Sequence, residues 1–195
     1  VTIQDYQSIC YGMPAKFGSV KRAAVVRDFD EFKRNLNIYV ISEDTSGKLL
    51  TANTTLKNNL RSWLLQYKVV NDTIDILDAE IVNFGINYVV AIDLNTNRFN
   101  VINRANAALR DYLVKNQYDI GESILITDFY KVLQKVNGII DVIDLEIVGK
   151  TGASYADSSF SFEDNLSADG RRIECQENAI FELKFANVDI KGAVQ

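Results

Sequence analysis

The chain has 195 residues, of which 47% are hydrophobic and 24% charged, and these proportions exclude a disordered chain and are typical of a globular protein. Its net charge of −5 argues against nucleic-acid binding, as do its scattered basic residues, whose densest group is Lys16, Lys21, Arg22 and Arg27. Histidine is absent, which excludes a histidine general base and any histidine-containing zinc site, and no apolar run approaches the roughly 20 residues that span a membrane.

The first fifty residues predict a capped helix followed by two strands. Thr2 and Asp5 form a capping box, which opens a helix over residues 2–9. Residues 20–26 and 38–41 predict strands, and Ser46-Gly47 predicts the turn that follows them. Because the chain starts without a Met or a signal-peptide pattern, we expect more protein upstream.

The clearest helix is predicted over residues 53–68. Asn53 or Thr54 caps its first turn, and its apolar side chains recur at the spacing of one helix face. That face consists of Leu56, Leu60, Trp63, Leu64 and Tyr67. We expect it to pack into the core.

Residues 80–93 predict one long strand with an apolar face. The face consists of Val82, Phe84, Ile86, Tyr88, Val90 and Ile92, at alternate positions. Gly85 interrupts the strand, which predicts a bulge or a close approach of another backbone.

Two further helices are predicted beyond this strand. One has the apolar face Ala105, Ala108, Leu109, Tyr112 and Leu113, and the other has the face Phe129, Val132, Leu133 and Val136. Thr127 is placed to cap the latter helix, and Gly138 to supply the left-handed conformation at its end. Residues 123–126 and 139–148 predict the strands on either side.

These elements predict an α+β fold: two small mixed units with helices packed on short mixed sheets, plus a β-rich C-terminal segment. We expect the first unit over residues 1–93, the second over 94–149 and the C-terminal segment over 150–195. A helix opened by Thr and Asp, a glycine and an apolar strand occur in both units, at residues 2–26 and 127–148, which suggests related halves.

The motifs supply no candidate for a catalytic, cofactor-binding or metal-binding residue. Gly149-Lys150-Thr151 resembles the end of a phosphate-binding loop, but Asp144 stands where the first glycine is required. The acidic groups lack the calcium-loop spacing and are interpreted as solvated faces: Asp72, Asp75, Asp78 and Glu80, and also Asp141, Asp144 and Glu146. Cys10 and Cys175 predict reduced thiols, because a chain with an apolar core does not need a disulfide.

Four stretches resemble a known family in their order and spacing. They are Thr2-x-x-Asp5-Tyr6 with Gly18-Ser19-Val20-Lys21-Arg22-Ala23; Ile38-Tyr39-Val40-Ile41 with Leu56-x-x-x-Leu60; Ile74-Asp75-Ile76-Leu77-Asp78-Ala79 and the strand after it; and Gly121-Glu122-x-Ile124 with Asp128-x-Tyr130 and Val136-x-Gly138-Ile139-x-Asp141-Val142. They look like the C-terminal part of the baseplate wedge protein of contractile-tailed bacteriophages, the J-like baseplate family. The resemblance covers roughly residues 2–148.

The resemblance implies a structural role with no enzymatic activity and no cofactor. Wedge proteins of this family associate with themselves, as a dimer or ring, and with other wedge proteins around the central hub. The implied location is the tail baseplate of the virion, assembled in the host cytoplasm, and neither nucleic acid nor membrane is an implied partner.

The C-terminal segment is the predicted assembly surface. Residues 149–172 are polar and turn-rich, yet they and the terminal strand carry aromatic residues of the kind that anchor interfaces. The candidates are Tyr155, Phe160, Phe162, Phe181 and Phe185. The alternative is that these side chains cover the chain's own core.

Two other functions stay open. A carboxylate-dependent glycoside hydrolase acting on cell-wall sugar would require a pair of carboxylates about 5–10 Å apart in a cleft. A small-ligand sensor built from ferredoxin-like units would require a deep apolar pocket.

Overall fold

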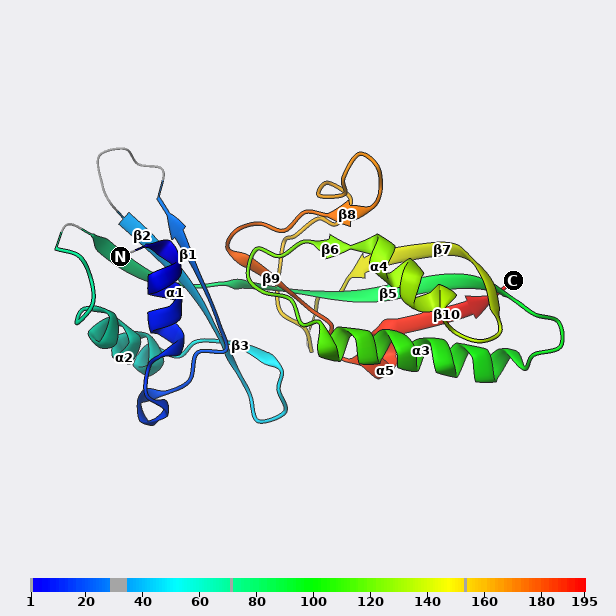
Figure 1. The fold of residues 1–195 in the computed structure, drawn as a ribbon, viewed down its shortest axis with the longest axis horizontal. Coiled ribbons are helices and arrows are strands. Elements are labelled where there is room, and N and C mark those ends of the chain that lie inside the picture. The colour runs from blue at the N-terminus through cyan, green and yellow to red at the C-terminus, as the bar shows by residue number, and fades with distance from the viewer. Residues whose placement is uncertain (1, 29–34, 71, 153) are drawn as a thin grey trace. The chain divides into compact units, whose positions relative to one another are not determined.

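The computed structural model describes residues 2–28, 35–70, 72–152 and 154–195, and its mixture of helices and sheets confirms the predicted α+β class (Figure 1). The helices are α1 (Ile3–Tyr11), η1 (Ala15–Phe17, a 3-10 helix), α2 (Thr54–Leu64), α3 (Arg98–Lys115), α4 (Ile126–Gln134) and α5 (Ala186–Asp189). The strands are β1 (Arg22–Arg27), β2 (Asn35–Glu43), β3 (Leu49–Thr51), β4 (Thr73–Asp78), β5 (Glu80–Ile92), β6 (Ile124–Leu125), β7 (Ile139–Gly149), β8 (Arg172–Ile173), β9 (Ala179–Glu182) and β10 (Ile190–Val194).

The chain divides into two compact units. The first comprises Val1–Ile81, Asp119–Gly121 and Gln176–Ile180, and the second comprises Val82–Tyr118, Glu122–Cys175 and Phe181–Gln195. The division by compactness therefore falls within β5, after Ile81. The three-part organisation with limits at residues 93 and 149 stays a prediction.

The first unit is a four-stranded sheet centred on β2, with helices packed on it. β1 and β3 pair with β2 antiparallel, and β4 pairs with it parallel. Its apolar core joins Tyr6 and Cys10 of α1 to Leu60 of α2 and Ile38 of β2. The predicted capping box is present, because Thr2 and Asp5 exchange hydrogen bonds at the start of α1.

Helix α2 is shorter than the apolar pattern predicts. Asn53 caps it by accepting a hydrogen bond from the Leu56 amide at 2.7 Å, and Leu56, Leu60 and Leu64 are buried as expected. Beyond Leu64 the chain tightens, since the Tyr67 amide donates to the carbonyl three residues back instead of four. Tyr67 consequently lies outside the helix and is 44% exposed, so its placement on the buried face was wrong.

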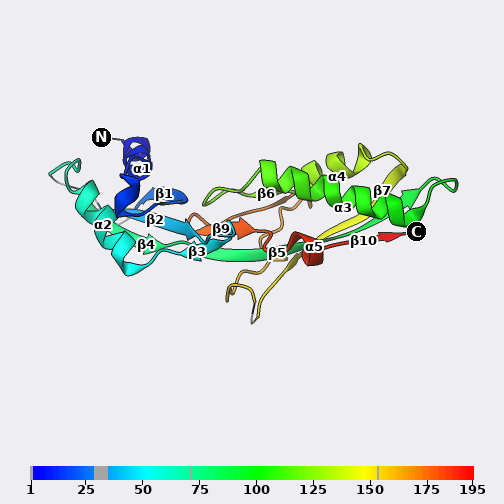
Figure 2. The same cartoon turned by 90° about the horizontal axis from the view of Figure 1, so that it is seen from below.

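The second unit is built around β5, which pairs with neighbours along both edges. β7 pairs with it antiparallel, β10 pairs with it parallel, and β9 also joins it. Helices α3 and α4 cover one face of this sheet (Figure 2). The predicted apolar face of β5 is buried from Val82 to Val90, while Ile92 at the strand end is half-buried.

Gly85 is the point at which other parts of the chain come closest to β5. A Cβ atom there would lie 2.8 Å from the carbonyl oxygen of Asp189 and 2.6 Å from Cε of Lys150. This confirms the predicted close approach. The irregularities of the β5–β7 pair lie elsewhere, between Val89 and Val90 and between Ala91 and Ile92.

Helix α4 starts earlier than its predicted cap. It begins at Ile126 after an N-cap residue, Leu125, that makes no side-chain cap bond, so Thr127 lies inside the helix and does not cap it. The start is set by a tertiary contact, because the Ile126 amide donates to the carbonyl of Arg171 at 2.9 Å. Gly138 has the predicted positive φ, 97°.

The buried leucines of α2 provide a stability test of the first unit. Replacing Leu60, which is fully buried, by Ala should lower the free energy of unfolding by about 2–5 kcal/mol, because a cavity replaces the lost side chain. Leu65→Ala is the matched control, since Leu65 is 56% exposed and should change stability by no more than about 0.5 kcal/mol. Urea unfolding followed by Trp63 fluorescence measures both, and equal losses would contradict the assigned packing.

The two cysteine thiols should differ in reactivity. Burial raises the pKa of the Cys10 thiol to about 12, and the thiolate is the nucleophilic form, so Cys10 is a neutral thiol throughout the mildly alkaline range. Cys175 is half-buried. We expect iodoacetamide to modify Cys175 in the folded chain and Cys10 only after unfolding, with peptide mass spectrometry as the readout. Modification of Cys10 at the faster rate would contradict its burial.

Candidate assembly surfaces

Three of the predicted assembly residues meet in one aromatic cluster of the second unit. The ring centroids of Phe160 and Phe162 lie 5.0 Å apart, and they lie 5.3 and 5.9 Å from the centroid of Phe181. Phe181 also contacts Phe84 and Tyr118 edge-to-face, at 6.3 and 6.2 Å. This cluster joins the 149–172 excursion to the central strand β5.

Tyr155 and Phe185 form a second group around a buried carboxylate. The Tyr155 hydroxyl donates to Asp189 Oδ1 at 2.6 Å, and the Phe185 amide donates to Asp189 Oδ2 at 2.9 Å. The two rings lie edge-to-face with centroids 5.4 Å apart. The hydrogen bond to the carboxylate raises the pKa of Tyr155, because losing the phenol proton would place two negative charges together.

A buried amide fixes the beginning of the excursion. Asn83 is 2% exposed, and its side chain donates to Glu182 at 2.8 Å and accepts from the Ala156 amide at 2.7 Å. Its own carbonyl accepts from the Lys150 amide at 2.9 Å. Since the nitrogen and the oxygen of the buried Asn83 side chain both have hydrogen-bond partners, the residue holds the loop without leaving a buried polar atom unpaired.

The structure therefore places the five predicted residues in two internal groups. Phe181 is 2% exposed, so its ring packs within the chain itself, while the other four residues are half-buried. The assembly role of Tyr155, Phe160, Phe162, Phe181 and Phe185 stays a prediction. Sequence reasoning missed the polar anchors Asn83 and Asp189, because a single Asn in a strand and a single Asp before one carry no pattern.

The Gly149-Lys150-Thr151 motif lies at the end of a strand. Gly149 is the last residue of β7, and Phe162 lies against it, with ring carbons 3.2 Å from where a Cβ would stand. The Lys150 amide, which a phosphate loop would turn towards its anion, donates to the carbonyl of Asn83. This arrangement is that of a strand end.

The acidic residues around β4 each have a separate structural contact. Asp72 accepts a hydrogen bond from the Tyr6 hydroxyl at 2.7 Å, and Asp75 accepts one from the Asn35 side chain at 2.9 Å. Asp78 forms an ion pair with Lys57 at 2.5 Å. Among the described residues, no three His, Cys, Asp or Glu side chains are grouped so as to hold a metal ion.

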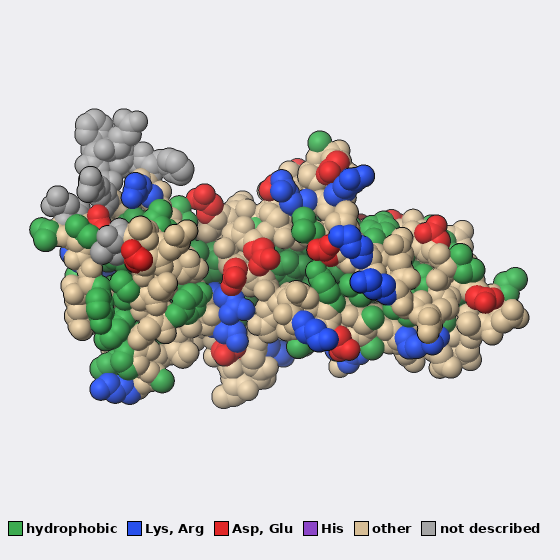
Figure 3. All heavy atoms as spheres, in the orientation of Figure 1, with side chains coloured by type: hydrophobic (Ala, Val, Ile, Leu, Met, Phe, Trp, Pro, Cys, Tyr) green, Lys and Arg blue, Asp and Glu red, His purple; other side chains and the backbone are tan. Residues whose placement is uncertain are grey.

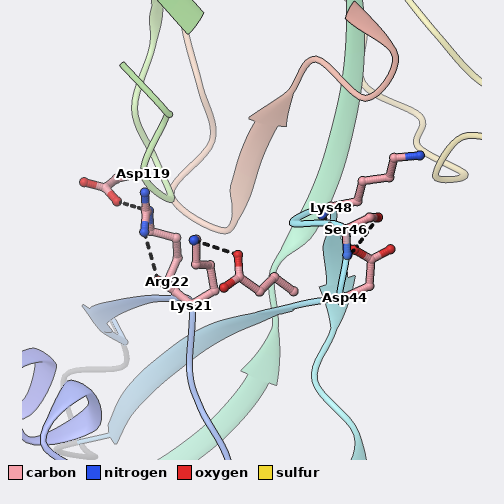
Figure 4. A network of polar contacts seen from close by, with 7 residues as sticks. Lys21, Arg22, Asp44, Ser46, Lys48 and Asp119 are labelled. Carbon is pink, nitrogen blue, oxygen red and sulfur yellow. Dashed lines mark hydrogen bonds and ion pairs between the residues drawn. The ribbon is translucent and has the colours of Figure 1, made fainter. Parts of the chain in front are cut away.

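Two residues of the densest basic group are paired with acids in the first unit. Lys21 contacts Glu43 at 2.6 Å, and Arg22 contacts Asp119 at 2.6 Å (Figure 4). Beside them Asp44 accepts hydrogen bonds from Ser46 and the Lys48 amide, which lowers the pKa of Asp44. These two ion pairs partly neutralise the densest basic group of the described residues.

No helix in the described part of the chain is long and apolar enough to cross a bilayer.

Comparison with known proteins gives a likeness that concerns the fold. No protein-family model matches the sequence, and no curated protein matches it. A chain of the cryo-EM structure of the anti-feeding prophage baseplate, 6-fold symmetrised, superimposes with a TM-score of 0.55 and 11% sequence identity over 94% of this chain. The fold of this chain is similar to that of part of this baseplate chain.

The likeness covers only part of the baseplate chain. It extends over 37% of that chain, so this protein spans little more than a third of its neighbour's length. At 11% identity the comparison concerns the fold, in agreement with the baseplate fold that the sequence resemblance implied.

The Tyr155–Asp189 hydrogen bond can be tested by removing one oxygen atom. Tyr155→Phe should lower the free energy of unfolding by about 1–3 kcal/mol, because Asp189 is 1% exposed and its Oδ1 loses its donor. Tyr130→Phe is the control, because the Tyr130 hydroxyl forms no hydrogen bond with another described residue. Urea unfolding followed by circular dichroism provides the measurement, and equal stability of both variants would contradict the anchoring role.

Proposed function

We propose that the chain is a structural wedge subunit in the baseplate of a phage-like contractile tail. It associates with copies of itself and with other wedge proteins around the central hub. The observation that carries this proposal is the fold likeness to a prophage baseplate chain over 94% of the sequence. The sequence resemblance over residues 2–148 points to the same class of protein. The corresponding location is the tail baseplate of the particle, assembled in the host cytoplasm.

Exposed apolar side chains at one end of the second unit support an assembly role. Leu94 is fully exposed, Ile140 is 70% exposed and Phe99 is 62% exposed. The Asp93 amide, next to Leu94, donates a hydrogen bond to the carbonyl of Gly138, two residues before Ile140, at 3.2 Å. Gathered apolar side chains at a surface are typical of sites that another protein covers.

The glycoside hydrolase alternative receives no support from the acidic residues. Glycosidic hydrolysis uses two carboxyl groups that share one substrate, with an acid on one side of the bond and a base or nucleophile on the other. The side chains of Asp72, Asp75 and Asp78 instead contact a phenol, an amide and an ammonium group, respectively. These contacts are those of residues that stabilise β4, and the proposal is accordingly a chain without enzymatic activity.

In this proposal the excursion is a fixed surface element. Its aromatic residues and the buried Asn83 and Asp189 hold it against the sheet, so it keeps one shape before and after a partner binds. A preorganised surface binds at lower entropic cost than a free loop. The partly exposed members, Tyr155, Phe160, Phe162 and Phe185, are then available at its margin.

The proposal is tested on contractile particles from the organism that encodes the chain. We expect the chain to co-purify with sheath-bearing particles and immunogold against it to label the sheath end that carries the baseplate. The purified chain should release no reducing sugar from cell-wall material, and Asp75→Asn should change nothing in that assay. Absence from the particles, or sugar release that Asp75→Asn abolishes, would overturn the proposal.

A further inference from the structure

A groove between α3 and α4 opens on the outer surface of the helical layer. Its volume is about 300 Å³, and its apolar lining includes Ala108 and Tyr112 from α3, Val132 from α4 and Val136 from the turn after α4. These four side chains are half-buried. The groove is therefore an apolar recess that the chain's own residues leave open to solvent.

The rim of this groove is cationic. Lys115 at the end of α3 and Lys135 just after α4 line it and are exposed, and Asp111 is the one acid of its lining. Neither lysine forms an ion pair with another described residue. Figure 3 shows several Lys and Arg side chains over the region of α3 and α4. The groove thus combines an apolar floor with unpaired ammonium groups.

The outer part of β7 carries apolar side chains beside acidic ones, so its charge is opposite to that of the groove. The register passes from Val89–Asp144 to Val90–Val142 and from Ala91–Asp141 to Ile92–Ile139, so Ile143 and Ile140 are extra residues of two bulges. They are 48% and 70% exposed. Asp141 and Asp144 alternate with them and are exposed too. We call Ile140, Asp141, Ile143 and Asp144 the β7 patch.

The groove and the β7 patch lie on different sides of α4. Val132 and Val136 line the groove. Tyr130 stands two residues before Val132, so it lies about 200° away around the helix and on its other side. Burial raises the pKa of Tyr130, and the charges of Asp144 and Asp141 raise it further, in agreement with a position of Tyr130 on the side of the β7 patch. One copy therefore presents the two surfaces in different directions.

We propose that the β7 patch of one copy docks into the α3–α4 groove of the next. The isoleucines meet the apolar floor, and Asp141 and Asp144 meet Lys115 and Lys135. Because the two surfaces differ, the contact is head-to-tail, and repeated head-to-tail contacts close into a ring or continue as a filament. This contact rests on the proposed function in the sense that it specifies how copies in a baseplate meet.

Charge reversal tests the contact. The groove variant is Lys115→Glu with Lys135→Glu, and the patch variant is Asp141→Lys with Asp144→Lys. We expect wild type to self-associate in sedimentation velocity over a wide range of concentrations, and each variant alone to associate more weakly by about tenfold or more, because like charges then face each other. An equal mixture of the two variants should regain the wild-type association, since each reversed surface finds its complement.

Matched controls separate a specific contact from the overall change in charge. Arg27→Glu with Arg61→Glu changes the net charge as the groove variant does, and Asp28→Lys with Glu177→Lys, at positions outside the 149–172 excursion, changes it as the patch variant does. All four control positions are exposed, and both controls should associate as wild type does. Circular dichroism of every variant checks that the fold is retained.

The outcomes distinguish this contact from the proposed function. A wild-type chain that stays monomeric at every concentration, variants that associate as wild type does, or a mixture that does not recover would each overturn the contact. The particle location of the chain is measured separately by immunogold. A chain present at the baseplate whose variants associate normally refutes the contact and leaves the proposed function standing.

Discussion

The second unit depends on one constraint, which is that β5 is buried on both faces over residues 81–86. A strand in that position needs hydrogen-bond partners along both edges and cover over both faces. β7, β9 and β10 supply the edges, and α3 and α4 cover one face. The excursion after β7 reaches the other face at two points: the Ala156 amide donates to the Asn83 side chain, and the Lys150 side chain lies close to Gly85. A segment without regular secondary structure is therefore a part of the fold.

Polar residues anchor this excursion, and aromatic residues provide its apolar contacts. Buried Asn83 and Asp189 have hydrogen-bond partners at both of their side-chain terminal atoms, so they direct the chain without leaving unpaired groups. The rings of Phe160, Phe162 and Phe181 then provide the buried apolar area. The glycine at position 85 is needed because a side chain there would meet the carbonyl of Asp189. Packing within the chain thus accounts for the presence of these aromatic residues, although aromatic residues are also typical of interfaces.

The proposed contact between copies uses two surfaces that the fold leaves uncovered. Two bulges expose isoleucines on β7 beside aspartates, and α3 and α4 leave an apolar recess rimmed by lysines. Bulges and charges on an edge strand also discourage indiscriminate pairing with other sheets, so a contact made there is made by side chains. Fold alone does not assign function. The proposed baseplate role therefore also rests on these surfaces and on the structural contacts of the acidic residues Asp72, Asp75 and Asp78.

The sequence by itself determined the local structure of this protein. The Thr2–Asp5 capping box, the buried leucines of α2, the alternation along β5 and the positive φ at Gly138 follow from interactions within a few residues of one another. Helix α2 ends before Tyr67 because the chain tightens there, with the Tyr67 amide donating to the carbonyl of Leu64. Tertiary structure decided the start of α4 before Thr127, because the Ile126 amide donates to the distant carbonyl of Arg171. It also decided that Phe181 faces inward and that Asn83 and Asp189 hold the excursion, because these roles depend on residues up to 99 positions apart in the chain.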